Sequence, residues 1–327
     1  MITAENLTKY FGTFAAIENV SFEVGRGEII GFLGPNGAGK STTMRILAGV
    51  YPPTRGRAVV AGYDIVRDAL RARAVVGYFP ERVSLYGDMT VTAYLAYVAA
   101  MKGLEGTRAR QDMAYALASC SLEPVRTRVI GTLSKGYRQR VGIAQALIGA
   151  PRVLILDEPT AGLDPEQVAE LRSLIRELRG ERTVILSSHV LSEIEATCDR
   201  VIIINRGRVL AVDTPTNLNR QLRRTSEVYL EVVAPDGDVV QTLRAVPGVL
   251  SVEPRANPGD GASALLVATE EGRDLRELIA ATVVGHGWAL RELRPVMLSL
   301  EEIFLSLVAT KESATETPNE VRRHLPA

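Results

Sequence analysis

The first two thirds of the chain alternate between short, unbroken apolar runs and longer segments with helical periodicity. The run Val153–Leu156 is representative, because four apolar residues stand between Pro151 and a pair of carboxylates. Strands that are buried on both faces carry such unbroken runs, and strands that alternate with helices form a parallel sheet. The pattern therefore predicts an α/β domain whose sheet is covered by helices on both faces.

The same periodicities place the individual elements. Arg206-Gly207 separates the last two strands of this part and is a hairpin signal. The predicted strands span residues 2–9, 20–24, 28–33, 58–61, 75–79, 153–156, 184–187, 201–205 and 209–213. The predicted helices begin near Lys40 and span 92–102, 108–119, 136–148, 166–178 and 192–197.

The last third has a sparser, more alternating pattern. Its predicted strands are 227–233, 249–254, 264–268 and 290–295, and its predicted helices are 238–245, 274–286 and 299–308. The order βαββαβ predicts a small α+β sandwich of the ferredoxin-like type. The polar stretch 214–220 opens with a proline and is interpreted as a helix start that leads into a linker. We therefore expect domains at 1–214 and 226–308, and a disordered tail over 311–327, which has no apolar period.

Composition narrows the class of protein. The 327 residues include 38 Lys plus Arg and 38 Asp plus Glu, and this neutral balance argues against a nucleic-acid binder that depends on excess positive charge. Two distant cysteines favour neither a disulfide framework nor a zinc site. Glu5 and Lys9 interrupt the N-terminal segment, so we expect no secretory signal. The longest uncharged, apolar-leaning stretch of the first half, 89–101, is shorter than the ~20 residues that span a bilayer.

Residues 34–41, GPNGAGKS, match the complete pattern GxxxxGK[ST] between a predicted strand and a predicted helix. Glycines let backbone N–H groups surround a phosphate chain, and the helix N-terminus adds positive charge. Lys40 is expected to reach the β- and γ-phosphates, Ser41 to bind Mg²⁺, and Thr42 to contact the α-phosphate. The predicted nucleotide-binding residues of this segment are Gly34, Pro35, Asn36, Gly37, Ala38, Gly39, Lys40, Ser41 and Thr42.

Two further segments carry possible chemistry. Asp157 and Glu158 follow the buried strand 153–156; Asp157 is suited to an outer-shell Mg²⁺ ligand, and Glu158 is placed to polarise an attacking water. Ser134 precedes a predicted helix, where it is a plausible N-cap whose free N–H groups are able to take a phosphate. By itself this second segment indicates no more than a helix cap.

Together these motifs resemble the nucleotide-binding domain of ATP-binding cassette (ABC) transporters. Leu133–Tyr137, LSKGY, resembles the LSGGQ signature and lies 23 positions before Asp157 when counted from Ser134 (157 − 134). The resemblance spans residues 1–214 and implies a P-loop NTPase cassette with a mixed sheet and a helical subdomain. Further matches in chain order are Phe11 for the adenine-stacking aromatic, with Tyr10 as the alternative, Gly77–Glu81 for the Q-loop, Ala161–Asp164 for the D-loop, and Ser188-His189 for the switch histidine.

The sequence departs from the family pattern at two motifs. Glu81 stands where many members have Gln, and Lys135 and Tyr137 replace Gly and Gln of the signature. The form LSKGYRQR together with GYxPE resembles the ABC-2 type branch, whose members are mostly exporters. Ser299–Leu305, SLEEIFL, resembles the closing SLEDVF-L segment of the accessory domain in that branch.

The resemblance implies that two copies, most simply a homodimer, enclose two ATP molecules. The resemblance gives catalytic roles to Glu158, His189 and Lys40. It makes Ser41, Asp157 and Glu81 the residues expected to bind Mg²⁺. Ser134 and Gly136 would act on the ATP of the other subunit, and Asp164 would cross the interface. Closure of such a site excludes water and completes the neutralisation of phosphate charge.

The resemblance also implies a separate membrane permease as partner, which places this subunit on the cytoplasmic, inner face of the membrane. Residues 83–101 would receive a helix of that permease, or form an ordinary helical core. Two alternatives remain open. A soluble ABC ATPase that acts on ribosomes or DNA usually carries two cassettes or a coiled-coil insertion, and an importer ATPase with a regulatory domain is disfavoured by the signature. The sequence leaves the cargo open.

Overall fold

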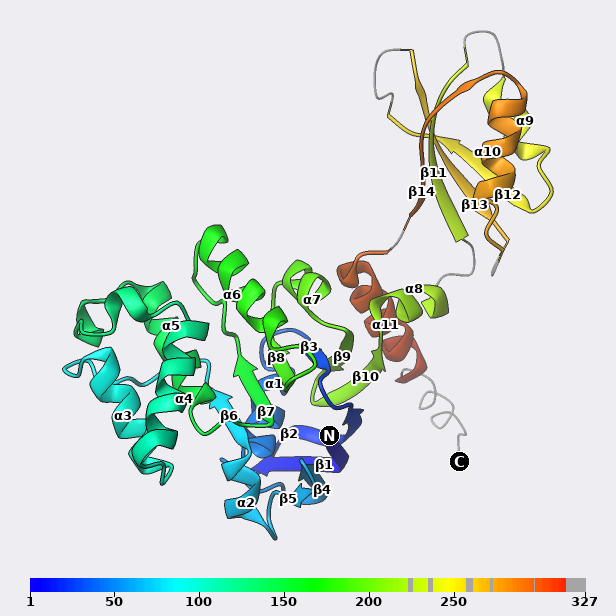
Figure 1. Cartoon of the computed structure of the whole chain (residues 1–327). Coiled ribbons are helices and arrows are strands. Elements are labelled where there is room, and N and C mark those ends of the chain that lie inside the picture. The colour runs from blue at the N-terminus through cyan, green and yellow to red at the C-terminus, as the bar shows by residue number, and fades with distance from the viewer. Residues whose placement is uncertain (223–225, 235–237, 257–260, 271–272, 297, 316–327) are drawn as a thin grey trace, which may run out of the picture. The chain divides into compact units, whose positions relative to one another are not determined.

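The computed structural model describes residues 1–222, 226–234, 238–256, 261–270, 273–296 and 298–315. The chain divides into two compact units, one of residues Met1–Pro215 with Leu307–Ala327 and one of Thr216–Ser306 (Figure 1). Each unit is described by itself below. Within the described ranges, no helix has both the length and the apolarity needed to cross a membrane.

A six-stranded sheet forms the centre of the first unit. Five strands are parallel and are ordered β9-β3-β8-β7-β6, and β10 pairs antiparallel with β9 at the edge. The predicted parallel sheet and the predicted hairpin at Arg206-Gly207 are both confirmed. The strand bounds are β3 Ile29–Leu33, β6 Val76–Phe79, β7 Val153–Asp157, β8 Thr183–Ser187, β9 Arg200–Asn205 and β10 Arg208–Asp213.

A second sheet, all antiparallel, has the order β2-β1-β4-β5. Its strands are β1 Ile2–Phe11, β2 Phe14–Val24, β4 Arg55–Val60 and β5 Tyr63–Asp64. Helix α1 (Lys40–Leu47) contacts both sheets and is buried on most sides, with Met44, Ile46 and Leu47 in one core with residues of each sheet. The sequence predicts three of these strands but not their separation into a sheet of their own.

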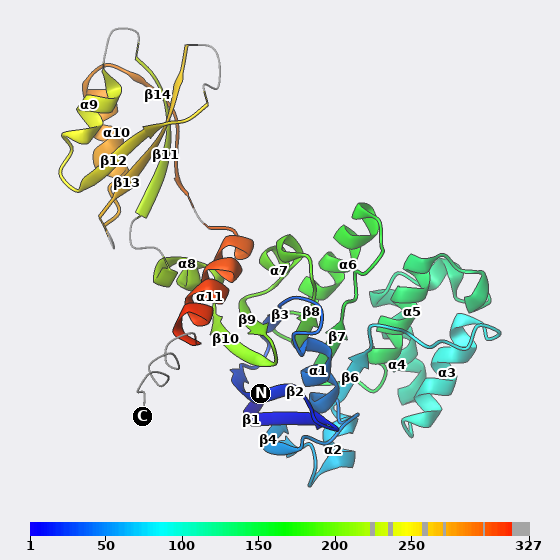
Figure 2. The same ribbon diagram turned by 180° about the vertical axis from the view of Figure 1, so that it is seen from behind.

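Three of the remaining helices form a helical region that contacts the large sheet at β6. Helices α3 (Val91–Met101), α4 (Gly106–Ser119) and α5 (Lys135–Leu147) pack on one another, and α5 also contacts β6 (Figure 2). Helix α7 (Leu191–Thr197) packs on β3 so closely that a Cβ on Gly31 would lie 2.7 Å from Cγ2 of Ile194. Helix α6 is Pro165–Glu177, and the short helices α2 (Ala69–Ala74), η1 (Glu123–Val125) and η2 (Ile130–Thr132) are not predicted by the sequence.

The second unit has the element order βαββαβ that the sequence predicts. Its strands lie in the order β12-β13-β11-β14, and α9 and α10 lie on the same side of this sheet (Figure 1, Figure 2). Val228, Leu230 and Ile279 belong to its core. The bounds are β11 Ser226–Val233, α9 Val239–Arg244, β12 Val249–Pro254, β13 Ser263–Thr269, α10 Arg276–Gly285 and β14 Ala289–Val296.

Along the chain, helix α8 (Pro215–Leu222) precedes these βαββαβ elements and helix α11 (Leu300–Thr315) follows them. The sequence predicts that helix 299–308 ends before a disordered tail that begins at Lys311. This expectation is wrong for residues 311–315, because α11 continues to Thr315. Once a helix has formed, each further residue adds a hydrogen bond at low entropic cost, so weakly apolar residues extend it. The rest of the predicted tail, 316–327, lies outside the described residues.

Candidate nucleotide-binding site

The loop between β3 and α1 is held tightly against neighbouring strands. Gly39 has a φ of 105°, and a Cβ there would lie 2.6 Å from Cγ2 of Ile17 and 3.0 Å from the carbonyl oxygen of Ala16. Side chains are disfavoured at such a φ and are excluded by this spacing. Glycine at this position therefore lets the backbone of the loop lie directly on β2 while α1 begins at the next residue.

Lys40 is almost completely buried at the start of α1. Its Nζ atom donates to the carbonyl oxygens of Gly34 (2.7 Å) and Pro35 (3.2 Å) and lies 3.9 Å from Oε1 of Glu158. Burial lowers the pKa of this ammonium group, and the negative charges of Glu158, Asp157 and Glu81 oppose that effect. A further negative charge in front of the loop, such as a phosphate, would favour the charged form of Lys40.

Asp157 ends β7 and is fully buried. Its Oδ1 atom accepts hydrogen bonds from Ser41 Oγ (3.0 Å) and Ser187 Oγ (2.8 Å). Among the described residues, no donor reaches the other oxygen, Oδ2. Burial raises the pKa of the carboxyl group, while the hydrogen bonds from Ser187 and Ser41 lower it. A buried carboxylate oxygen without a partner, beside a serine hydroxyl, fits the oxygen ligands that Mg²⁺ prefers.

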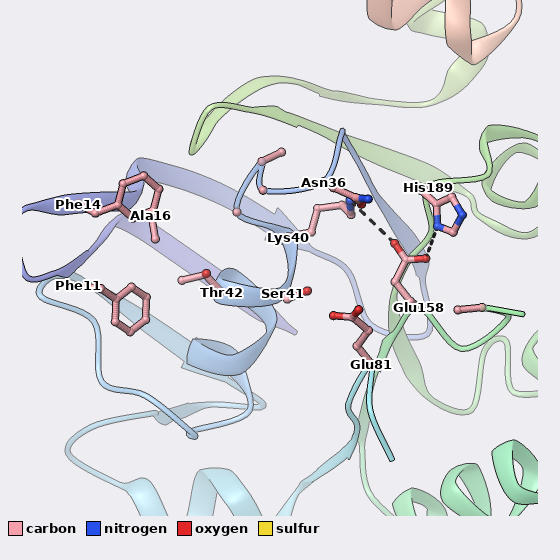
Figure 3. A pocket seen from close by; sticks show the side chains of 14 residues that line it. Phe11, Phe14, Ala16, Asn36, Lys40, Ser41, Thr42, Glu81, Glu158 and His189 are labelled. Carbon is pink, nitrogen blue, oxygen red and sulfur yellow. Dashed lines mark hydrogen bonds and ion pairs between the residues drawn. The ribbon is translucent and has the colours of Figure 1, made fainter. Parts of the chain in front are cut away.

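Glu158 turns out of the sheet directly after Asp157. Its φ of 52° is unusual for a residue other than glycine, and its backbone N–H donates to Ser187 Oγ at 2.9 Å. Its Oε2 atom lies 2.7 Å from Nδ1 of His189, so that the carboxylate lies between Lys40 and His189 (Figure 3). Residues held in this backbone region cluster at functional sites, where surrounding contacts maintain the strain.

Lys40, Glu158 and His189 face one cavity of about 470 Å³ (Figure 3). Its volume falls in the usual range for small-molecule and cofactor sites. It brings together the predicted residues Phe11, Asn36, Gly37, Ala38, Gly39, Lys40, Ser41, Thr42, Glu81, Glu158 and His189. Gly34, Pro35 and Asp157 do not line it; they contact Lys40 or Ser41 from behind.

Three further residues line this cavity: Phe14 and Ala16, which the sequence analysis missed, and Ala161, which was expected only as the first residue of the D-loop. Phe14 pairs with Phe11 across the β1–β2 hairpin, so both aromatic rings come from the same turn. Phe11 is half exposed and contacts Tyr51 edge to face with ring centroids 5.7 Å apart. Tyr10, the alternative adenine-stacking residue, does not line the cavity. An aromatic residue three positions after another, across a glycine turn, was the available signal for Phe14.

Ser134, Gly136 and Asp164 do not line the cavity. Ser134 and Asp164 are the N-caps of α5 and α6, where their side chains accept from the backbone N–H groups of Tyr137 (3.4 Å) and Gln167 (2.9 Å). The Gln167 side chain covers Gly136, where a Cβ would lie 2.6 Å from its Oε1 atom. Lys135 of the signature segment approaches Gly162 of the D-loop, and of these two segments only Ala161 lines the cavity.

Residues 17–161 match the family model described as ABC transporter. Over 222 residues the chain is 38% identical to "Probable multidrug ABC transporter ATP-binding protein YbhF" of Escherichia coli (strain K12), a match that covers 68% of this chain but only 38% of that protein. It is 34% identical to "Linearmycin resistance ATP-binding protein LnrL" of Bacillus subtilis (strain 168), over 77% of this chain and 81% of that one. It is 33% identical to "Daunorubicin resistance ATP-binding protein DrrA2" of Streptomyces coeruleorubidus, over 96% and 97%.

Solved structures match about two thirds of the chain. A structure of the ATP-binding subunit of an ABC transporter superposes with a TM-score of 0.62 and 32% identity, over 68% of this chain and 92% of that chain. A dimeric post-hydrolysis state of the ATP-binding cassette MJ0796, bound to ADP and Pi, gives a TM-score of 0.59 and 25% identity, over 65% and 98%.

Proposed function

This chain belongs to the ABC transporter family as an ATP-binding subunit, and on that basis we propose that it hydrolyses ATP to drive export through a separate membrane permease. The observation that supports hydrolysis most directly is the position of Glu158. Its carboxylate lies 2.7 Å from His189 and 3.9 Å from the Lys40 ammonium, at the edge of the cavity that the phosphate loop lines. A carboxylate between a cation and an imidazole is suited to orient and polarise a water.

Each of these groups has a distinct proposed task. The loop N–H groups and Lys40 bind the phosphates, and Glu158 orients the attacking water. His189 holds Glu158 in place and lies beside the γ-phosphate. Ser41 and Asp157 would hold Mg²⁺, with Glu81 facing it. When bound, the ion supplies positive charge that offsets the charge of the phosphates. Phe11, together with Phe14, offers an aromatic surface for the adenine ring.

We propose further that the working form is a dimer, most simply of two identical chains. The structure supports this indirectly, since Ser134, Gly136 and Asp164 lie outside the cavity of their own chain. The N-terminus of α5 is suited to bind a phosphate from a second subunit, because backbone N–H groups point out of a helix at that end. The dimeric MJ0796 cassette is a precedent for such an assembly in a protein of the same fold.

Export is proposed from the relatives. Two of them are named for resistance to linearmycin and daunorubicin, and the match to the second of these continues through the second unit of this chain. A permease partner would hold the subunit at the inner face of the membrane. Drug-like cargo is consistent with these names, and contacts with the cargo would lie on the permease.

The test is Glu158→Gln in the full chain, with Glu177→Gln as a matched control on α6. The amide keeps the shape but is a much weaker base, so we expect phosphate release to fall at least 100-fold while ATP binding persists. ATP and Mg²⁺ should then convert the variant from monomer to a stable dimer in light scattering. Wild-type turnover by this variant would exclude Glu158 as the water-orienting group, and a monomer at saturating ATP would exclude the dimer.

The partner is tested by affinity capture of the full chain from detergent-solubilised membranes. Recovery of a protein with several membrane spans supports the transporter proposal. Recovery of ribosomes or DNA without such a protein would instead favour the alternative of a soluble ABC ATPase.

A further inference from the structure

The two loops that carry Glu158 and His189 are also linked away from the cavity. Oε2 of Glu193, on the first turn of α7, accepts hydrogen bonds from Thr160 Oγ1 at 2.6 Å and from Ser188 Oγ at 2.9 Å. Thr160 follows β7 and Ser188 follows β8, which are parallel neighbours in the sheet. One carboxylate oxygen therefore joins the two loops.

The two residues that Glu193 joins are close in the chain to Glu158 and His189, which contact each other at the cavity. Thr160 lies two residues after Glu158, and Ser188 immediately precedes His189. Nearer the sheet, Ser187 already joins the same two strands through Asp157 Oδ1 and the N–H of Glu158. Glu193 adds a second link between the same two loops, through Thr160 beyond Glu158 and through Ser188 directly before His189.

Helix capping alone does not account for this arrangement. Glu193 is the third residue of α7, and Ser188 Oγ accepts from the N–H of Val190 at 3.0 Å, so the contact between Ser188 and Glu193 stays within the turn that leads into α7. The bond from Thr160 is different, because Thr160 lies on the other loop, 33 positions before Glu193 in the chain. This bond is also the shorter of the two that Glu193 accepts. The start of a helix needs no hydrogen bond to a residue so distant in the chain.

We propose that Glu193 is a positioning residue for hydrolysis, which fixes Glu158 against His189 by holding Thr160 and Ser188 together. The inference rests on the proposed function, because it requires a reaction that this pair carries out. Reacting groups must be held to within about 0.5 Å, and hydrogen bonds from surrounding residues supply that precision. Glu193 does not line the cavity, so its loss is expected to change turnover and not ATP binding.

Three variants of the full chain separate this role from a structural one. Glu193→Ala removes the acceptor, Glu193→Gln keeps a carbonyl oxygen that is able to accept both bonds, and Thr160→Val removes one donor at nearly constant shape. Glu195→Gln, at an exposed position of the same helix, is the control. We expect E193A and T160V to lower kcat at least 10-fold, with KM and the Kd for ATP within twofold of wild type. E193Q should retain at least half of the wild-type kcat, and E195Q all of it.

A double variant sharpens the test. If Glu193 acts through Thr160, then E193A combined with T160V should be no slower than E193A alone, since both changes remove the same link. T160V and E193Q also keep the test valid if E193A folds poorly, which its Tm would reveal. Wild-type kcat in T160V and E193A, or equal loss in E193Q and E193A, would overturn the role of Glu193 as a hydrogen-bond acceptor. Absence of hydrolysis by the unaltered chain with its permease would overturn the proposed function itself, and this inference with it.

Discussion

Nδ1 of His189 lies 2.7 Å from Oε2 of Glu158, although 31 positions separate the two residues in the chain. The sheet explains this proximity. Strands β7 and β8 are parallel neighbours in which Asp157 pairs with Ser187, so the residues that follow the two strands emerge side by side. The contact therefore depends on strand register, and a local change in either loop is expected to disturb it.

Replacement of His189 by Ala should lower the rate of ATP hydrolysis by a factor of roughly 10² to 10⁴, the range found for groups that assist proton transfer or orient its partner. ATP binding should remain, because the phosphate loop and the aromatic pair are untouched. Single-turnover phosphate release and equilibrium nucleotide binding separate these two effects. His286→Ala, at an exposed histidine of the second unit, should behave as wild type; an H189A chain with full turnover would contradict the assigned role.

Ser187→Ala should lower the free energy of unfolding by about 1–3 kcal/mol, because it leaves the buried N–H of Glu158 without its acceptor. The lost hydrogen bond to Asp157 should also raise the pKa of that carboxyl group beyond its already elevated value. Binding of Mg²⁺ needs the ionised form, so the Mg²⁺ dependence of hydrolysis should shift to higher pH. Urea unfolding and a pH series at fixed ATP measure these effects, with the exposed Ser192→Ala as control.

Phe11→Ala should weaken ATP binding by about 10-fold or more, if the aromatic turn stacks on the base, since such stacking contributes ~1–3 kcal/mol. Phe14→Ala should have a similar, smaller effect, because its more exposed ring lines the same cavity. Tyr10→Ala is a matched control from the same strand. Inorganic tripolyphosphate, which has no base, should bind wild type and both variants equally in calorimetry, and a parallel loss of tripolyphosphate binding would point to misfolding of the loop.

Asp64 provides a test of stability against pH. The backbone N–H of Arg67, that of Val66 and the Arg57 guanidinium hold its pKa at about 2, against an ordinary value of 3.8. A carboxyl whose pKa is lower in the folded state stabilises the fold above its unfolded pKa, and this contribution is lost as the pH falls towards the folded pKa. Wild type should therefore exceed Asp64→Asn by about 1–2 kcal/mol at pH 6, and the difference should shrink below pH 4. A difference that stays constant in urea titrations from pH 6 to pH 3 would refute this assignment.

The D-loop glycine offers a last test. Gly162 has a φ of 70°, and a Cβ there would collide with Nζ of Lys135. Gly162→Ala should cost about 1 kcal/mol in unfolding free energy, mostly from the left-handed backbone. Because the lysine is long and flexible, the double variant with Lys135→Ala should recover only a small part of that loss. Recovery of the whole loss would show that the clash, and not the backbone, sets the cost.

Local motifs were predictable from the sequence, and long-range pairings were not. Gly34–Ser41 and the acidic pair after 153–156 are contiguous, and their chemistry follows from residue order alone. Ser187 joins the site through a strand register that no short motif encodes, whereas Phe14 joins it through a hairpin whose local signal is the aromatic pair across a glycine turn. The roles of Ser134, Gly136 and Asp164 toward a second subunit were assigned only through the resemblance to the family, and these roles stay predictions.

In the fold, too, the features that local patterns encode were predicted, and those that depend on pairing between distant segments were not. Strands with unbroken apolar runs were placed to within one or two residues, because burial on both faces requires such runs. The two-residue strand β5 and the arginine-rich helix α2 were missed, since ALRARA has little apolar periodicity and Tyr63-Asp64 is too short to show any. The split of the strands into two sheets was missed as well, since it depends on which strands pair with one another and not on the pattern of any one strand.

Strand β3, which leads into the phosphate loop, lies between β8 and β9 in the sheet. The ribosome synthesises these two neighbours much later than β3. The N–H of Ile29 bonds to the carboxylate of Asp199, 170 positions further along the chain. At ribosomal rates of ~5–20 residues per second, this neighbour follows roughly 10 to 30 seconds after β3 has been synthesised. A nascent chain thus holds the complete nucleotide motif long before it has the sheet that shapes it. Until β8 and β9 are made, β3 lacks both of its neighbours in the sheet, so we expect ATP to bind only once the chain is almost finished.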